Sequence, residues 1–262
     1  MATLENKSPS EFYKDLLQTA NSNTGIDNSS RMVQCGNGDK TAFEIGRNEV
    51  KVKPVVNSAT AFEVQDSSGS SVFSVNTTTG RAMTGSVPVN SQVKEFNLSY
   101  GASIPSTANT WSAIPANQMA GIGTSLGELQ FGTSSSATAS VSLTANAHLY
   151  PAYWWYVPYD IDIFAIKTQT ASDTANGDEF IYSVSKYDLN TGNTSSSGNL
   201  TNGTQIALSL AETSAGFEQV YYKDLVLDNA QVTGGQAVLA FIKQDGTNSD
   251  LSCNLQIFYT FV

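Results

Sequence analysis

The sequence predicts an all-β protein with a short N-terminal helix, a stem of small repeated strands and a C-terminal β-sandwich head of jelly-roll type. Charged residues make up only 14% of the 262 residues, below the average of about 25% in globular domains. Ser, Thr, Asn and Gly take their place, and these residues favour turns and strand edges. Short alternating runs of apolar and polar residues recur between clusters of turn residues. We therefore divide the chain into segments 1–40, 41–90 and 91–262.

The segment 1–40 contains one clear helix signal. Ser8-Pro9-Ser10-Glu11 is a capping box with proline at the first helical position. A helix of about twelve residues is marginal alone in water, so this one docks either on its own domain or on a larger assembly. The candidate docking face of the helix, which would end near residue 20, consists of Phe12, Tyr13, Leu16 and Leu17.

The segment 41–90 repeats a strand–turn–strand pattern. Thr41-Ala42-Phe43-Glu44-Ile45 is followed, nineteen residues later, by Thr60-Ala61-Phe62-Glu63-Val64. Units this small do not bury their apolar faces alone. Three copies of the chain around one axis would cover them, and a meander packed on the neighbouring domain is the alternative. We favour a trimeric stem formed by Phe43, Ile45, Val50, Val52, Phe62, Val64, Val72 and Val75.

The segment 91–262 has the regular strand spacing of a sandwich or jelly roll. The alternation of apolar residues in 161–167 predicts a central strand, and residues 84–140 show little pattern beyond one strand and a possible edge strand within 121–131. Turns are expected at Asn202-Gly203 and at Thr233-Gly234-Gly235. The predicted strands are 93–100, 141–145, 161–170, 179–188, 204–210, 219–227, 237–243 and 251–262.

Six aromatic residues gather within 150–159. Such side chains offer a large contact area with a polar tip, which suits sugar rings or protein partners. The alternative is that they fill the core of the sandwich or a seam between subunits. The cluster consists of Tyr150, Tyr153, Trp154, Trp155, Tyr156 and Tyr159.

The polar residues form no recognisable catalytic or metal-binding motif. His148 is the only histidine and has no nucleophile motif near it. Asp160 and Asp162 could face one side of a strand as paired carboxylates, but acidic residues at a strand start are more often solvated. The acidic loop 173–179 lacks the spacing of an EF-hand. We therefore predict no enzyme activity, no cofactor and no metal.

Charge and cysteine content restrict the partners and the compartment. The net charge is −10, and an acidic surface repels nucleic acids and anionic membranes. No apolar run is long enough for a bilayer span or a signal sequence, so we expect no membrane insertion. Cys35 and Cys253 lie in different segments, which fits a protein made in a reducing cytoplasm without a disulfide.

Several segments resemble the virion fibre proteins of marine and freshwater phages. The resemblance implies a homotrimer made in the host cytoplasm and carried on the virion. It also implies an N-terminal part attached to a capsid or tail protein and a distal part facing outward. The residues that carry it are Leu4-Glu5-Asn6-Lys7-Ser8-Pro9, Tyr13-Lys14-Asp15-Leu16-Leu17, Gly25-Ile26-Asp27, the repeated Thr-Ala-Phe-Glu motif before Val50-Lys51-Val52, and Tyr156-Val157-Pro158-Tyr159-Asp160-Ile161.

We therefore expect a homotrimeric fibre or spike whose head binds the host surface, with a glycan as a plausible receptor. One alternative is a capsid decoration protein of the same build, which stabilises the shell without a receptor. The other is a free carbohydrate-binding module or, less in keeping with the missing catalytic motif, a glycan hydrolase.

Overall fold

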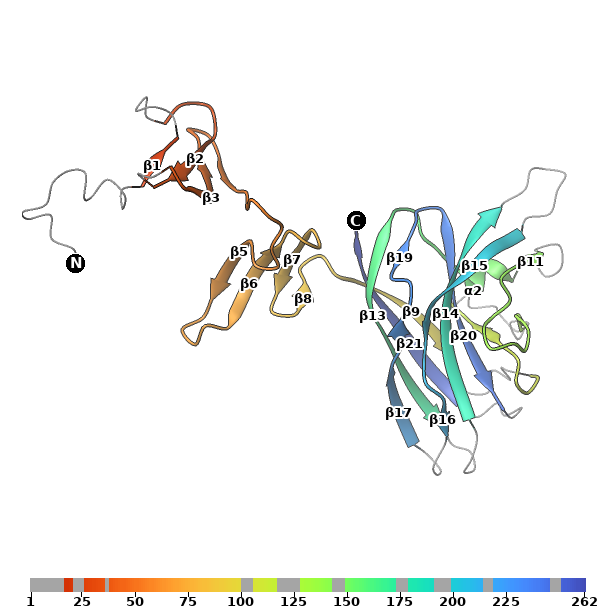
Figure 1. Cartoon of the computed structure of the whole chain (residues 1–262). Helices are drawn as coiled ribbons and strands as arrows, with labels where there is room; N and C mark the ends of the chain where they lie inside the picture. Colours follow the sequence, from red (N-terminus) through yellow and green to blue (C-terminus); the bar gives the residue numbers. More distant parts are fainter. Residues whose placement is uncertain are drawn as a thin grey trace, which may run out of the picture. The chain divides into compact units, whose positions relative to one another are not determined.

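The computed structural model describes residues 17–20, 26–35, 38–99, 106–116, 128–142, 149–172, 179–190, 199–213, 219–245 and 251–262. The chain divides into two compact units, Met1–Asn90 and Ser91–Val262, each with sheets of its own (Figure 1). This division falls at the boundary placed after residue 90. The strands pair antiparallel, and the described residues contain a single helix, α2 (Tyr150–Tyr153). The predicted all-β class is confirmed. No helix in the described ranges has the length and apolar character needed to cross a membrane.

The first sheet has the order β1-β2-β3-β4. Its strands are Gln18–Thr19, Arg31–Gln34, Lys40–Ile45 and Val50–Val52. β1 and β2 belong to the same sheet as β3 and β4. The boundary predicted after residue 40 therefore falls within one sheet and does not separate two structural units.

The predicted helix is wrong at its C-terminal end. Residues 18 and 19 are extended and pair with β2, which satisfies their backbone groups in a sheet. Leu17, expected on the docking face, is 70% exposed and lies directly before β1. Phe12, Tyr13 and Leu16 lie outside the described residues.

The second sheet has the order β5-β6-β7-β8, with strands Phe62–Gln65, Ser71–Asn76, Arg81–Thr84 and Val87–Pro88. The turn between β5 and β6 is built around Asp66 and Gly69. Oδ1 of Asp66 accepts hydrogen bonds from the backbone N–H groups of Ser68 and Ser70, at 2.8 and 3.0 Å. Gly69 has a φ of 84°, a left-handed conformation that glycine adopts without steric cost. The carboxylate and the glycine together fix the tight connection between β5 and β6.

The second unit contains two sheets that face each other across one core (Figure 1). The five-stranded sheet has the order β17-β13-β21-β9, with β19 also paired to β13. These strands are Gln219–Asp224, Ile161–Ser172, Leu251–Phe261, Gln92–Leu98 and Gln231–Val232. The eight-stranded sheet has the order β10-β20-β14-β15-β11, with β12, β16 and β18 at its sides. Its strands are Ser112–Ile114, Gln236–Gln244, Glu179–Asn190, Asn199–Leu208, Val141–Ser142, Trp155–Tyr156, Glu212–Thr213 and Val226–Leu227.

The eight-stranded sheet is buried on both of its faces, as β20 shows. Val238, Ala240 and Ile242 point into the core between the two sheets. The alternate residues, among them Leu239 and Phe241, point into a second apolar cluster on the other face. That cluster also receives α2 and side chains from the segments 111–113 and 129–131. The second unit therefore has two layers of apolar packing, one on each face of this sheet.

The central strand predicted at 161–167 is confirmed, because β13 lies between β17 and β21. The register of β13 shifts between Ile163 and Ala165, because Phe164 forms a bulge and reverses the alternation that follows. The turn expected at Asn202-Gly203 lies inside β15. Asn202 has a left-handed φ of 53°, and a Cβ at position 203 would collide with the ring of Tyr187. This glycine therefore serves close packing and does not end a strand.

Candidate functional site

An apolar face runs along the β3–β4 hairpin of the first unit. Phe43 lies opposite Val52, and Ile45 lies opposite Val50. Directly opposed residues point to the same side of a sheet, so these four predicted stem residues share one face. Phe43, Val50 and Val52 are all exposed to solvent on it.

The second sheet repeats this arrangement. Phe62 lies opposite Val75, and Val64 lies opposite Phe73. The rings of Phe62 and Phe73 meet edge to face, with their centroids 6.3 Å apart. Phe62 is 42% exposed, the same fraction as Phe43, its counterpart nineteen residues earlier. The sequence repeat is thus also a repeat of cross-strand pairs.

Val72 lies at a register shift in β6. Val64 pairs with Phe73 and Gln65 pairs with Ser71, so Val72 is the extra residue on this strand and has no direct partner in β5. Its place on the stem face stays a prediction. The apolar face of the β5–β8 sheet, as the structure defines it, consists of Phe62, Val64, Phe73, Val75, Ala82 and Val87.

Most of the predicted aromatic cluster packs against the two apolar layers of the second unit. Tyr150 and Tyr153 are buried in the outer apolar layer, and Trp154 packs against it. Burial raises the pKa of Tyr153 to about 12, so its hydroxyl stays protonated at any physiological pH. Trp155 packs against the main core, with its ring 4.8 Å from that of Tyr259. These four residues are thus explained by packing.

Two aromatic residues of the cluster remain at the surface. Tyr156 is 52% exposed and Tyr159 is 69% exposed. The ring of Tyr159 meets that of Phe261 edge to face at 6.3 Å, and Phe261 itself is half exposed. Tyr159 and Phe261 form a small exposed aromatic pair beside the C-terminal end of β21.

The polar groups considered for chemistry have structural roles or lie outside the described residues. Oδ1 of Asp160 accepts a hydrogen bond of 2.7 Å from the backbone of Gly234, which holds the turn before β20. His148 and most of the acidic loop 173–179 are not described. In the part of the chain that is described, no three His, Cys, Asp or Glu side chains gather to hold a metal ion. Cys35 and Cys253 are free thiols.

A feature that sequence reasoning missed is a polar row across the outer face of the five-stranded sheet. The register aligns Tyr222, Gln169, Asn254 and Asn97 on four neighbouring strands. The amide of Gln169 donates to the hydroxyl of Tyr222 at 3.1 Å. The amide of Asn254 donates to Oδ1 of Asn97 at 2.6 Å. We call these four side chains the amide row.

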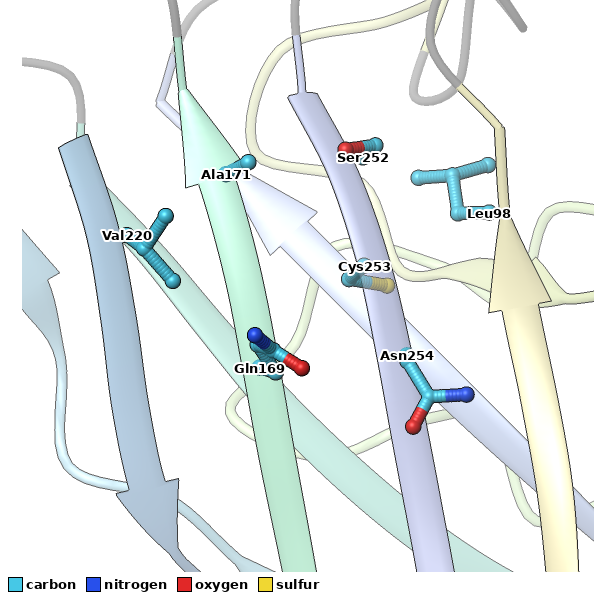
Figure 2. A pocket seen from close by; sticks show the side chains of 7 residues that line it. All are labelled: Leu98, Gln169, Ala171, Val220, Ser252, Cys253 and Asn254. Carbon is cyan, nitrogen blue, oxygen red and sulfur yellow. The ribbon is translucent and has the colours of Figure 1, made fainter. Parts of the chain in front are cut away.

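A shallow hollow of about 300 Å³ lies beside the amide row (Figure 2). Small side chains, Ala171 and Ser252, occupy the next outward-facing positions of β13 and β21. Because these side chains are short, the surface of the sheet is depressed next to the longer side chains of Gln169 and Asn254. The residues lining the hollow are Leu98, Gln169, Ala171, Val220, Ser252, Cys253 and Asn254.

One sequence signal for this face exists. Leu251-Ser252-Cys253-Asn254-Leu255-Gln256 alternates strictly, and Leu251, Cys253 and Leu255 are buried. The partners of Asn254 come from β9 and β13, so the row itself depends on the strand register.

No known protein-family model matches the chain, and no curated protein sequence is significantly similar to it.

Proposed function

We propose that this chain is a self-assembling structural protein, a homotrimeric fibre or spike of a virus particle with a trimeric stem and a jelly-roll-like adhesive head. The observation that carries the proposal is the pair of repeated apolar faces in the first unit. The resemblance to phage fibre proteins supplies the virion setting. Its implied partners are further copies of this chain, a capsid or tail protein that holds the N-terminal segment, and a receptor on the host.

The apolar faces favour association because their side chains are largely exposed in the described part of one chain. Phe43, Val50, Phe62 and Val64 are all exposed on sheets of only four short strands. Contiguous exposed apolar surface marks a site of protein contact or an aggregation hazard. Other copies of the same chain offer equally apolar faces, so association through them removes both surfaces from water. A closed ring of three copies avoids the open-ended growth that a non-closing contact produces.

The mass of the full-length protein in solution tests the assembly. Light scattering at micromolar concentration should give three times the chain mass of 27.9 kDa. A monomer under these conditions would contradict the stem, and a dimer would contradict three-fold association.

The virion setting needs a separate experiment. An antibody raised against the full-length protein should label purified particles of the virus that encodes it. A chain lacking residues 1–16 keeps β1 and should form the same oligomer but be absent from particles. Particles that carry the truncated chain at normal levels would show that attachment uses another segment.

A further inference from the structure

We propose that the amide row and the hollow beside it bind a neutral oligosaccharide. This inference rests on the proposed function, because it assigns the adhesive role of the head to one face of the five-stranded sheet. It differs from the sequence-based expectation, which placed a ligand site in the aromatic cluster at 150–159.

The amide row is held in place before any ligand arrives. Gln169 and Asn254 are each fixed by a hydrogen bond to the next strand, at 3.1 and 2.6 Å. Their backbones lie in the central strands β13 and β21, which pair along eleven registered positions. A ligand therefore meets side chains that have already lost much of their rotamer freedom, which lowers the entropic cost of binding.

The free polar atoms of the row match sugar hydroxyls. Each cross-strand bond uses one N–H of the amide, so Gln169 and Asn254 each keep a carbonyl oxygen and a second N–H for a ligand. A sugar hydroxyl both donates and accepts, and an amide offers both functions side by side. Neighbouring strands lie about 4.8 Å apart, so the row presents such groups at a spacing close to the length of one sugar ring.

Apolar contacts are available next to these polar groups. Tyr222 ends the row on β17 and is 74% exposed, so much of its ring is accessible. Val220, which lines the hollow, is exposed on the same strand. The C–H face of a sugar ring can lie against such side chains while its hydroxyls reach the amides. The hollow is shallow and open, as suits a segment of a longer glycan chain.

The charges around the hollow favour a neutral ligand. Lys167 lies on β13 two residues before Gln169, opposite Asp224 of β17. Its ammonium group forms an ion pair with Asp224 at 3.1 Å. Gln256 in the same row donates to Glu95 at 2.9 Å. An anionic glycan would thus meet a neutralised lysine, an additional carboxylate and a protein of net charge −10.

Affinity electrophoresis of the full-length protein tests this assignment. Native gels containing dextran, amylose, laminarin or galactomannan are compared with a gel containing alginate, which is anionic. We expect retardation by at least one neutral polysaccharide. Gln169→Ala combined with Asn254→Ala should weaken it roughly tenfold for each amide removed. Gln231→Ala is the matched control, because Gln231 is an exposed amide of the same sheet, paired with Asp162 and outside the hollow.

The outcomes separate this inference from the proposed assembly. Three results overturn the glycan site. In the first, no neutral polysaccharide retards the protein, and in the second, only alginate does. In the third, the double variant is retarded as strongly as the wild type. Light scattering on the double variant provides the remaining check. A lower mass than that of the wild type would mean that this face holds a second copy of the chain, and would also overturn it. A wild-type monomer that still binds a neutral polysaccharide through these amides would overturn the trimer and leave the site standing.

Discussion

Replacing Phe62 with serine should weaken the proposed trimer without unfolding the chain. The ring is 42% exposed in the single chain. If the whole side chain offers about 200 Å², association covers about 80 Å² of it. At about 25 cal/mol per Å² this contributes about 2 kcal/mol per copy. Three copies lose about 6 kcal/mol, which corresponds to about four orders of magnitude in the association constant of the trimer.

The assay is mass photometry over a dilution series from micromolar to nanomolar concentration. The control is Val56→Ser, which removes a 76% exposed apolar side chain from the connection between β4 and β5, outside both sheets. We expect Phe62→Ser to dissociate at concentrations where the wild type and Val56→Ser stay assembled. Equal dissociation of the two variants would refute the assignment of the contact to the apolar face of the sheet.

Three further predictions concern the sandwich. Cys35 should react with a thiol reagent in the native protein, whereas Cys253 should react only after unfolding. The reason is that Cys253 is buried, which raises the pKa of its thiol to about 12. Rapid labelling of both cysteines in the native protein would contradict this packing. Phe241→Ala, which removes a fully buried ring 4.8 Å from that of Phe131, should lower the free energy of unfolding by about 3–5 kcal/mol in urea melts; a loss well below this would mean that the outer layer packs loosely. Burial alone would raise the pKa of Glu128, but hydrogen bonds from neighbouring side chains lower it below its ordinary 4.5. The ionised Glu128 carboxylate therefore stabilises the fold above pH 4.5, and this stabilisation is lost as the pH falls through the pKa of Glu128 in the folded protein. Thermal melting of Glu128→Gln at acid pH should consequently depend less on pH than melting of the wild type.

The sequence predicts the long strands well because their alternation or continuous apolar character is local. β13, β14, β20 and β21 lie within a few residues of their predicted bounds. β15 is the exception, because it begins at Asn199, five residues before its predicted start. The repeat in 41–64 likewise indicated the hairpins and their apolar faces. What these segments share is a pattern that a window of five to ten residues already contains.

The remaining features depend on contacts between distant residues. Trp111 and Phe131 are single apolar residues in segments without periodicity, yet both are buried on the outer face of the eight-stranded sheet. The run of apolar residues in β20 indicates a strand covered on both sides, but it does not indicate what covers it. Similarly, the amide row needs the register of four strands, which no single strand contains.

The pairing of β9 with β21 sets an order of events during synthesis. Glu95 and Gln256, which bond across these two strands, are 161 residues apart. A ribosome therefore has to make nearly the whole head before its five-stranded sheet can close. In the described part of the first unit, by contrast, each strand pairs with its neighbour in sequence, so these hairpins can form as soon as they leave the exit tunnel. If the proposed trimer forms through the first unit, neighbouring nascent chains on one messenger would join there while the second unit of each chain is still open.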